Sequence, residues 1–270
     1  MAARSATQST LDGPEVLLRA DADGIATLTM NRPRARNSLS SGLIEAMSDQ
    51  LAAIAVDDAA RVVVIATSGP AFCAGHDMKQ MRADPDLHGY ESLFAASSRL
   101  MLAIMRLPKP VIAKVAGTAS AAGAQLVASC DLAVASNESL FATPGVDIGL
   151  FCSTPMVALS RNMARKQTME MLLTGAPIDA QSAVAMGLIN KAVPAEALDE
   201  AVAELAATIL AKPARVVALG KLAYYRQLEM GISDAYAYAG RVMASNMMMA
   251  DATEGIDAFL EKRPPNWPEG

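Results

Sequence analysis

The sequence contains few of the residues on which metal and redox chemistry depend. Its 270 residues include two histidines, His76 and His88, and three cysteines, Cys73, Cys130 and Cys152. Two histidines are too few for a multi-histidine metal site, and cysteines without CxxC spacing support neither a zinc site nor a redox motif. A sparse, odd number of cysteines is typical of a reducing compartment. We therefore expect no resident metal or other cofactor and a cytoplasmic location, or the mitochondrial matrix if the source is eukaryotic.

Long apolar runs and an excess of basic residues are also absent. The longest apolar stretches, such as RVVVIAT at 61–67, have the length of a strand and are too short to span a membrane. The net charge is −5, without a basic stripe, so neither a membrane nor nucleic acid is an expected partner. Residues 1–14, MAARSATQSTLDGP, lack the apolar segment of a secretory signal, and we expect a disordered tail there.

What the sequence does have is an alternation of strand and helix patterns. Two strands around the turn DADG are expected within 16–33, followed by a helix at 40–57 with apolar residues at helical spacing. Further on, strands are expected at 62–67, 111–117, 131–136 and 139–144, and helices at 90–107 and 122–129. The fold class is therefore α/β, with a strand–turn–helix–strand unit that recurs from about residue 60 to residue 145.

The last third of the chain is predicted to be helical. Helices are expected at 154–165, 167–173, 179–186, 196–211, 214–229, 232–250 and 253–261. The segment RVMASNMMMA at 241–250 has a wide apolar face, which indicates either core packing or a subunit interface. We divide the chain into the tail at 1–14, a core at 15–195 and a helical C-terminal region at 196–270.

Two loops of small residues are the strongest candidates for a site. SGPAFCAGHDMKQ at 68–80 and GTASAAGAQL at 117–126 each follow an expected strand and lead toward a helix. Small residues let a ligand approach the backbone, and a helix start leaves N–H groups unpaired. Two such loops side by side form an oxyanion hole that stabilises charge on a carbonyl oxygen. The alternative is that the small residues only let a helix pack closely on a sheet.

Neither loop matches a common nucleotide-binding or hydrolase motif. The phosphate loop GxxxxGK[ST] and the dinucleotide fingerprint GxGxxG are absent from both, and no GxSxG elbow is present in the chain. The loops therefore predict neither a nucleoside triphosphate site nor a hydrolase triad on that scaffold.

The two loops, together with several other phrases, resemble the crotonase superfamily of enoyl-CoA hydratases and isomerases. The phrases that carry this resemblance are NRPRARNSLS (31–40), AFCAGHDMK (71–79), KPVIAKVAGTASAAGAQLVASCDLAVAS (109–136), FATPGVDIGL (141–150), LLTGAPIDAQSAVAMGLINKAVP (172–194) and EGIDAFLEKRPPNW (254–267). They follow the order of the family over nearly the whole chain. Within the superfamily they are most similar to a branch that carries the hydratase name by similarity.

The resemblance implies a fold, a substrate class and a set of site residues. The fold is a crotonase-like spiral of strand–strand–helix turns with an α-helical C-terminal trimerisation region. Family members are homotrimers, often paired as dimers of trimers, and they bind acyl-CoA thioesters and stabilise a thioester enolate. The two oxyanion N–H groups fall at His76 and at Ala122, which precedes Gly123. The CoA-binding positions are Arg34, Arg36, His76, Asp77, Met78 and Lys79, with Lys262 and Arg263 as weaker candidates.

The sequence departs from the family pattern at the acids. Hydratases of this family use two glutamates as general acid and base, and these positions are Gln125 and Gly145 here. A third acidic position, used by some isomerases and dehalogenases, is Ser153. An amide cannot exchange a proton near neutral pH, and a positioned acid or base typically contributes ~10²–10⁴-fold in rate. The sequence therefore lacks the acid–base residues of the hydratase mechanism, although it has the phrases that predict the fold.

Four other side chains are candidates to replace the missing catalytic acids. The His76 imidazole has a suitable intrinsic pKa, and Asp147 lies two residues beyond Gly145. Cys152 and Ser153 are nucleophile candidates without a visible base. Asp77 is expected to cap a helix rather than to act as an acid.

Three functions stay open from the sequence. The first is an acyl-CoA-processing enzyme of the hydratase/isomerase type. The second is an acyl-CoA-binding scaffold or sensor without catalysis. The third is an acyl-CoA thioesterase, which needs only an oxyanion hole and a positioned water.

Overall fold

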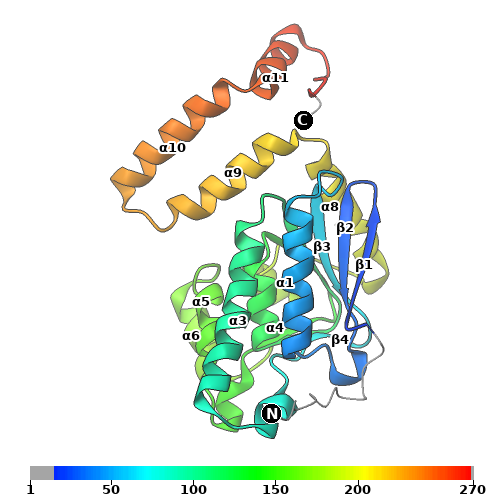
Figure 1. Ribbon diagram of the computed structural model, residues 1–270, viewed down its shortest axis with the longest axis vertical. Coiled ribbons are helices and arrows are strands. Elements are labelled where there is room, and N and C mark those ends of the chain that lie inside the picture. The colour runs from blue at the N-terminus through cyan, green and yellow to red at the C-terminus, as the bar shows by residue number, and fades with distance from the viewer. Residues whose placement is uncertain (1–14, 269–270) are drawn as a thin grey trace, which may run out of the picture.

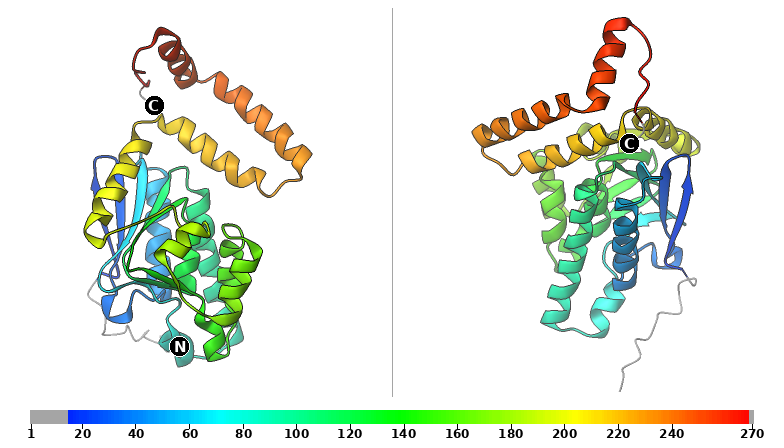
Figure 2. Two further views of the ribbon diagram at one scale, coloured as in Figure 1. Left: turned by 180° about the vertical axis from the view of Figure 1, so that it is seen from behind. Right: turned by 45° about the horizontal axis from the view of Figure 1, so that its top comes forward.

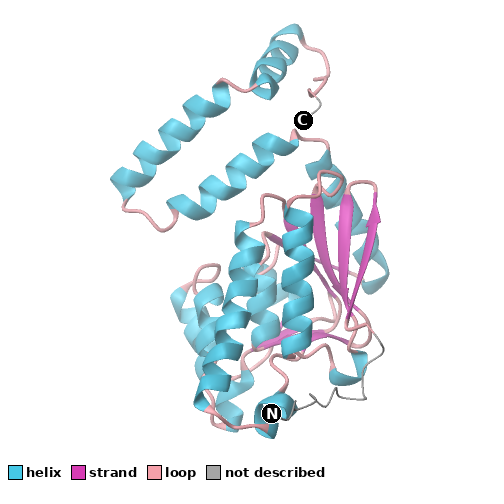
Figure 3. Cartoon of the chain, in the orientation of Figure 1, coloured by secondary structure: helices cyan, strands magenta, loops and turns pink. Residues whose placement is uncertain are grey.

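The computed structural model describes residues 15–268, and a six-stranded sheet runs through their centre (Figures 1 and 3). An antiparallel hairpin of β1 (Leu17–Ala22) and β2 (Ile25–Met30) forms one edge. It is followed by β3 (Val62–Thr67), β5 (Val111–Val115), β7 (Leu132–Ser136) and β10 (Lys191–Val193), all parallel to β2. The apolar sequence of β3 follows from its place inside this parallel sheet, where both faces are covered.

A second, four-stranded sheet gives the fold its spiral form. Its strands are β4 (Ala71–Cys73), β6 (Thr118–Ser120), β8 (Leu140–Ala142) and β9 (Ile178–Asp179), in that order. β4, β6 and β8 are parallel, and each follows a strand of the first sheet along the chain. The ends of β4 and β6 therefore lie side by side, which brings the two small-residue loops together.

Helices cover both faces of the six-stranded sheet, as the views in Figures 1 and 2 show. On one face lie α1 (Ser41–Ala55), α3 (Leu87–Arg106) and α4 (Ala122–Ser129), and on the other lies α8 (Leu198–Leu210). An apolar cluster lies between the sheet and each of these helix layers. Within β3, Val63 and Ile65 belong to the cluster on the side of α1, α3 and α4, whereas Val62 and Val64 belong to the cluster on the side of α8. This alternation is the period of two that a strand imposes on its side chains.

The C-terminal helices extend away from the spiral. They are α9 (Ala214–Gln227), α10 (Ile232–Met247) and α11 (Ala250–Glu261), and Figures 1 and 2 show α10 and α11 projecting from the rest. Large apolar side chains on these helices and their connections are exposed, including Leu228, Ile232, Tyr236, Met243, Met248, Phe259 and Leu260. The core-packing interpretation of 241–250 is therefore wrong for the single chain. No helix within 15–268 is long and apolar enough to cross a membrane.

The remaining elements are short, and they account for most differences from the expected pattern. They are η1 (Pro33–Ala35), α2 (Met78–Ala83), η2 (Pro144–Ile148), α5 (Ser153–Leu159), α6 (Arg165–Thr174), α7 (Ala180–Ala185) and η3 (Ala195–Ala197). The helix expected at 154–165 ends at Leu159, and the strand expected at 111–117 ends at Val115, with a second strand from Thr118. The bend falls at Gly117, where φ is +76° and a Cβ would lie 2.2 Å from the Pro70 carbonyl oxygen.

The predicted α/β architecture, a spiral of strand and helix turns followed by a helical C-terminal region, is thus present. The tail predicted at 1–14 lies outside the described residues, and the boundary at residue 195 stays a prediction.

Candidate functional site

The two small-residue loops pack directly against each other. A Cβ on Gly75 would lie 3.1 Å from the Ala121 Cβ and 3.6 Å from the Ala122 nitrogen. A Cβ on Gly123 would lie 2.2 Å from the Cys73 carbonyl oxygen, closer than any side chain allows. Glycine at these two positions therefore lets α4 begin against the end of β4. The small residues serve close packing, and the same packing brings the backbone amides of the two loops together.

The direction of the His76 N–H is set by the residue that pairs with it. Leu39 donates its N–H to the Gly75 carbonyl at 2.8 Å and accepts the Asp77 N–H at 3.1 Å. A trans peptide directs its N–H opposite to its C=O, and the described residues contain no cis peptide. The His76 N–H therefore points away from Leu39. No acceptor among the described residues takes it.

The Ala122 N–H is fixed by the same kind of constraint. The Ala121 carbonyl accepts the Gln125 N–H at 3.1 Å, so the N–H of the Ala121–Ala122 peptide points out of the helix start. Ala121 has φ 49° and ψ −113°, a conformation that an L-residue rarely adopts. Its own N–H donates to the Ala142 carbonyl at 2.8 Å, which holds this conformation. Within the described chain the Ala122 N–H also lacks an acceptor.

The His76 side chain faces inward and stays neutral. Its ring meets the ring of Phe94 edge-on, with 5.2 Å between the centroids. Its Nε2 is buried without a hydrogen-bond partner within 15–268. Burial lowers the pKa of His76 to about 4, so the imidazole carries no charge at neutral pH. A buried neutral imidazole adds no positive charge to the site and is a weak base.

Gln125 occupies the interior of α4. Its side chain is buried, and Oε1 has no hydrogen-bond partner among the described residues. Ser97 Oγ on α3, one helical turn beyond Phe94, is likewise buried, and it has no hydrogen-bond partner within 15–268. Buried polar atoms without partners are rare in native proteins and are commonly satisfied by water or a ligand. An uncharged amide at 125 avoids the desolvation cost that a carboxylate would carry there.

The other two family acid positions differ sharply in their surroundings. Gly145 lies in η2, where a Cβ would lie 2.8 Å from the Leu150 carbonyl oxygen and 3.0 Å from the Cys152 sulfur. Ser153 is exposed at the start of α5, and its Oγ donates weakly to the Phe151 carbonyl at 3.3 Å. The loop therefore leaves no room for an acid at 145.

The structure gives little support to Cys152 as a nucleophile or to Asp147 as an acid. Burial raises the pKa of the Cys152 thiol, which keeps it protonated and poorly nucleophilic. Asp147 is exposed on η2.

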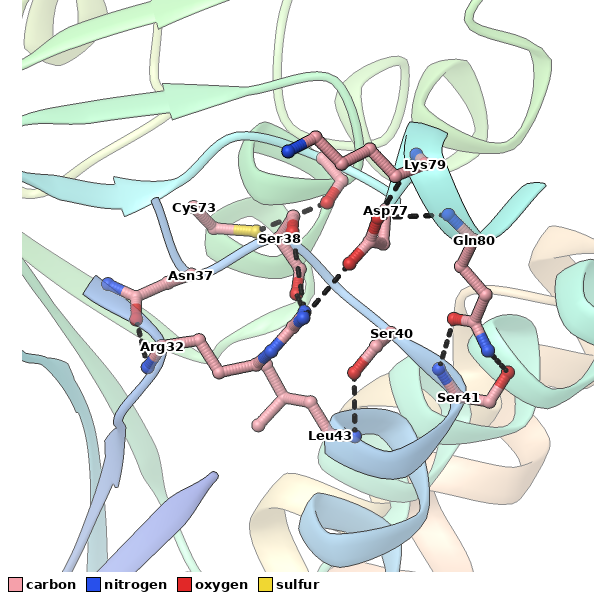
Figure 4. Close-up of polar contacts among 11 residues, drawn as sticks. Arg32, Asn37, Ser38, Ser40, Ser41, Leu43, Cys73, Asp77, Lys79 and Gln80 are labelled. Atoms are coloured by element: carbon pink, nitrogen blue, oxygen red, sulfur yellow. Dashed lines mark hydrogen bonds and ion pairs between the residues drawn. The ribbon is translucent and has the colours of Figure 1, made fainter. Parts of the chain in front are cut away.

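A buried polar network, which the sequence patterns do not reveal, supports the His76 loop (Figure 4). Arg32, only 3% exposed, donates to the Ser38 carbonyl at 2.5 Å and to Asp77 Oδ2 at 2.9 Å. The Asn37 side chain accepts the backbone N–H of Arg32 through Oδ1, and its Nδ2 donates to the carbonyls of Ser68 and Ala71. The network ties the chain before α1 to the chain on both sides of β4.

Asp77 is the helix cap that the sequence predicts. Its Oδ1 accepts the N–H groups of Lys79 and Gln80 at 3.1 Å each. Burial opposes the charged carboxylate, but the bond from Arg32 and the two backbone N–H groups hold the pKa of Asp77 below its usual range. The carboxylate is thus committed to structure, which leaves it a poor general acid.

The basic residues proposed for CoA separate into two groups. Arg34, Arg36 and Lys79 are exposed close to the His76 loop, since the Arg36 carbonyl accepts the Ala74 N–H at 3.0 Å. Lys262 and Arg263 follow α11, at the opposite end of the molecule from α2 in Figures 1 and 2. Arg263 is also paired with Glu254 and Glu261. Within one chain the structure does not bring the two groups together.

Residues 15–268 contain no set of ligands for a metal centre. The described residues hold no cluster of three or more His, Cys, Asp or Glu side chains that could bind a metal ion.

Comparison with known proteins places the chain among proteins of one fold. Residues 20–270 match the family model described as enoyl-CoA hydratase/isomerase. The chain is 44% identical to the rat protein named enoyl-CoA hydratase domain-containing protein 3, mitochondrial, over 91% of this chain and 82% of that protein. It is 34% identical to a putative enoyl-CoA hydratase of Thermus thermophilus, over 90% of this chain and 97% of that protein.

Solved structures agree with these sequence relationships. A crystal structure of an enoyl-CoA hydratase from Mycobacterium smegmatis is 52% identical and superimposes with a TM-score of 0.92, covering 94% of this chain and 99% of that one. Human enoyl-CoA hydratase domain-containing protein 3 is 42% identical with a TM-score of 0.90, covering 94% and 100%. The branch that the sequence resembles is therefore the one named after that protein. The chain belongs to the enoyl-CoA hydratase/isomerase family.

Proposed function

We propose that this protein is an enzyme that processes acyl-CoA thioesters and holds the thioester carbonyl between the N–H groups of His76 and Ala122. The observation that carries the proposal is the pair of adjoining N–H groups whose peptide carbonyls are both fixed by hydrogen bonds and which lack acceptors within 15–268. Negative charge develops on the carbonyl oxygen as a thioester enolate forms. Preorganised donors aimed at that oxygen contribute about 10²–10³-fold each.

The CoA moiety is expected to lie along the loop that leads to α2. Asp77, Met78 and Lys79 follow His76 directly, and exposed Arg34 and Arg36 lie on the neighbouring turn. Lysine and arginine are suited to bind the phosphates, and the Met78 side chain, 41% exposed, offers an apolar contact. Lys262 and Arg263 contribute only if another subunit brings them to this face.

Proton transfer is where this protein departs from a standard hydratase. Gln125 offers an amide, Gly145 has no side chain, and Ser153 is an exposed hydroxyl. The chain then relies on oxyanion stabilisation and proximity, with water or the neutral His76 imidazole moving the proton. His76→Ala retains the backbone N–H. Unchanged turnover in this variant confines His76 to its main-chain role, whereas a large loss assigns a role to the imidazole.

The direct test is turnover of crotonyl-CoA and longer enoyl-CoA thioesters, followed by loss of absorbance and by the mass of the product. Addition of water to the substrate, or a shift of its double bond without a change in mass, supports a hydratase or an isomerase respectively. If a broad acyl-CoA panel gives no turnover above buffer, the enzyme proposal is abandoned.

The missing acids support two alternatives. One is a catalytically inactive scaffold or sensor, for which calorimetry should show tight binding of an acyl-CoA without turnover. The other is a thioesterase, for which a thiol reagent should detect release of free CoA. Hydration leaves the thioester intact, so thiol release separates these reactions. Absence of any acyl-CoA binding rejects all three functions.

We also propose that the chain assembles as a homotrimer or a dimer of trimers. The exposed apolar side chains of α9, α10 and α11 support this, because monomeric proteins rarely leave such surface uncovered. Light scattering measures the mass of the assembly directly. Phe259, 81% exposed, is a suitable residue to replace by Asp, and an unchanged mass in that variant would remove this face from the interface.

The compartment stays a proposal. The relatives named after domain-containing protein 3 carry the word mitochondrial in their names, whereas the sparse cysteines suit any reducing compartment. We keep the cytoplasm as the proposed location, with the mitochondrial matrix if the source is eukaryotic, and fractionation of the source cells tests it.

A further inference from the structure

We propose that Arg32 polarises the His76 N–H through a line of two hydrogen-bonded peptide groups, and so acts as a positioning residue for the bound thioester carbonyl. The inference rests on the proposed function, since it concerns the same carbonyl-binding donor. It adds a buried cation, 44 positions away in the sequence, to the groups that act on the substrate.

The line of groups is continuous. The Arg32 guanidinium donates to the Ser38 carbonyl at 2.5 Å, and the N–H of that same peptide, carried by Leu39, donates to the Gly75 carbonyl at 2.8 Å. The N–H of the Gly75–His76 peptide is the proposed oxyanion donor. Both peptides are trans, so each receives a donor at its oxygen and presents its N–H on the other side. Figure 4 shows Arg32 directed at Ser38 and Asp77.

This alignment has an electrostatic consequence. A positive charge at the oxygen of a peptide draws electrons toward it and makes its N–H a stronger donor. Hydrogen bonds in a chain strengthen one another by about 10–30% per bond in condensed-phase estimates. Solvent does not screen this chain, because Arg32 is 3% exposed, Ser38 is 8% exposed and Leu39 is fully buried. Through the two peptides, the Arg32 charge therefore polarises the His76 N–H.

Asp77 distinguishes this relay from a purely mechanical clamp. Its Oδ2 accepts a hydrogen bond from Arg32 at 2.9 Å and offsets part of the guanidinium charge. Asp77→Asn removes that negative charge, and asparagine is also a good helix cap for α2. The relay predicts that the His76 N–H becomes an equal or stronger donor in this variant. A clamp predicts a weaker donor, because the ion pair that holds the loop is lost.

The experiment measures the carbonyl itself. Butanoyl-CoA labelled with ¹³C at the thioester carbonyl has no double bond to hydrate. Its carbonyl stretch, followed by isotope-edited infrared spectroscopy, moves to lower frequency as the carbonyl is polarised. We expect Arg32→Met to lose about a tenth to a quarter of the wild-type shift, because the cooperative strengthening over the two links acts on the His76 donor and leaves the Ala122 donor unchanged. We expect Asp77→Asn, measured at saturating butanoyl-CoA so that a change in CoA affinity does not enter, to retain or exceed the wild-type shift.

A matched control keeps loop attachment separate from polarisation. Gln80 accepts the Ser41 N–H at 2.9 Å and donates to the Ser41 hydroxyl at 3.0 Å, so it also ties α2 to α1, but it has no place in the Arg32 line. Gln80→Ala should therefore leave the carbonyl shift unchanged. Turnover adds a second measure: Arg32→Met should lower kcat about tenfold, within the loss expected for a weakened oxyanion donor, with KM changed less than about twofold.

The outcomes separate failure of this inference from failure of the proposed function. If wild-type protein does not bind butanoyl-CoA or does not shift its carbonyl stretch, the proposed function fails. If the wild type shifts the stretch and folded Arg32→Met shifts it equally, the relay is wrong. If Arg32→Met does not fold, the Asp77→Asn variant tests the relay by itself. A reduced carbonyl shift in that variant rejects the relay and means that Arg32 only holds the loop in place.

Discussion

The α-carbon of Gly123 lies against the carbonyl group of Cys73, so closely that a Cβ at position 123 would stand 2.2 Å from the Cys73 oxygen. This contact joins the start of α4 to the end of β4, and with it the two loops that carry the proposed oxyanion donors. A backbone oxygen cannot rotate away as the end of a flexible side chain can. The separation of the two donors is therefore set by a residue without a side chain.

Gly123→Ala should damage both stability and carbonyl binding. The added methyl must push α4 away from β4, and overpacking of this kind typically costs about 1–3 kcal/mol of unfolding free energy. Urea unfolding measures that loss, and the infrared shift of bound butanoyl-CoA measures the displacement of the Ala122 N–H. Gly42 on α1, whose Cβ would meet no atom of residues 15–268 within 4 Å, is the matched control. Equal effects of Gly42→Ala and Gly123→Ala would contradict this account.

His76 should make the stability of the protein depend on pH. Burial lowers its folded-state pKa from 6.5 to about 4, so the unfolded chain binds the proton more readily over that interval. The contribution of neutral His76 to the free energy of unfolding is therefore fully present above pH 6.5. It is lost as the pH falls toward about 4, by roughly 3 kcal/mol at most. Urea unfolding at pH 7, 6 and 5 should show this loss in the wild type. His76→Phe, which retains an aromatic ring beside Phe94, should show less of it.

The second histidine provides the control for this pH series. His88 near the start of α3 has a side chain that is 90% exposed. His88→Gln should therefore reproduce the wild-type pH dependence between pH 7 and 5. A wild-type slope in His76→Phe would show that other groups cause the loss of stability.

The fold was largely predictable because its elements have strong local patterns. The apolar repeat of α1 and the continuous apolar run of β3 each favour one type of element, and both are present. The short strands β4 and β6 were not separated from their neighbours in the sequence, because three residues are too few to show a period. The bend at Gly117 that creates β6 depends on contact with Pro70, which is distant in the sequence.

The site was predictable only in part, for a related reason. Small residues before a helix indicate free N–H groups, but their direction depends on Leu39, which lies 37 positions before His76. The pairing of Arg32 with Asp77 likewise joins two segments that no sequence period connects. The sequence identified the acid positions at 125 and 145 through family resemblance, but it did not reveal that the loop at 145 is closed.

Installing the second family acid at position 145 should fail. A Cβ there would lie 2.8 Å from the Leu150 carbonyl oxygen, and the Leu150 N–H also donates to the Gly145 carbonyl at 2.8 Å. Gly145→Glu must open this turn and should cost about 1–3 kcal/mol or more in thermal or urea unfolding. Gly149→Asn in the same turn is the control, since Gly149 has φ +78°, no atom of the described residues would lie within 4 Å of its Cβ, and asparagine tolerates that conformation. Should Gly145→Glu be as stable as the control, the loop is more adaptable than its contacts indicate.

The attachment of α9 to the rest of the fold depends on a buried ion pair between Lys221 and Asp131. Lys221 of α9 donates to Asp131 Oδ2 at 2.6 Å and to the carbonyls of Ile104 and Lys109 at 2.9 Å each. Tyr225 donates to the other oxygen of Asp131 at 2.9 Å. The side chains of Lys221 and Asp131 are 7% and 16% exposed, so this pair attaches α9 to the spiral in a largely dry environment.

Lys221→Met should therefore destabilise the protein by about 3–5 kcal/mol, because it leaves the Asp131 carboxylate buried without its cation. Burial already raises the pKa of Asp131, and losing the lysine raises it further. The deficit should shrink as the pH falls, since protonation removes the unpaired charge. Lys114→Met is the control: Lys114 also pairs with an aspartate at 2.6 Å, but that partner, Asp199, is 85% exposed, and loss of the pair should cost at most about 1 kcal/mol. Urea unfolding of both variants at pH 7 and pH 5 measures the difference, and similar losses that do not vary with pH would assign the effect to lost packing rather than to the buried charge.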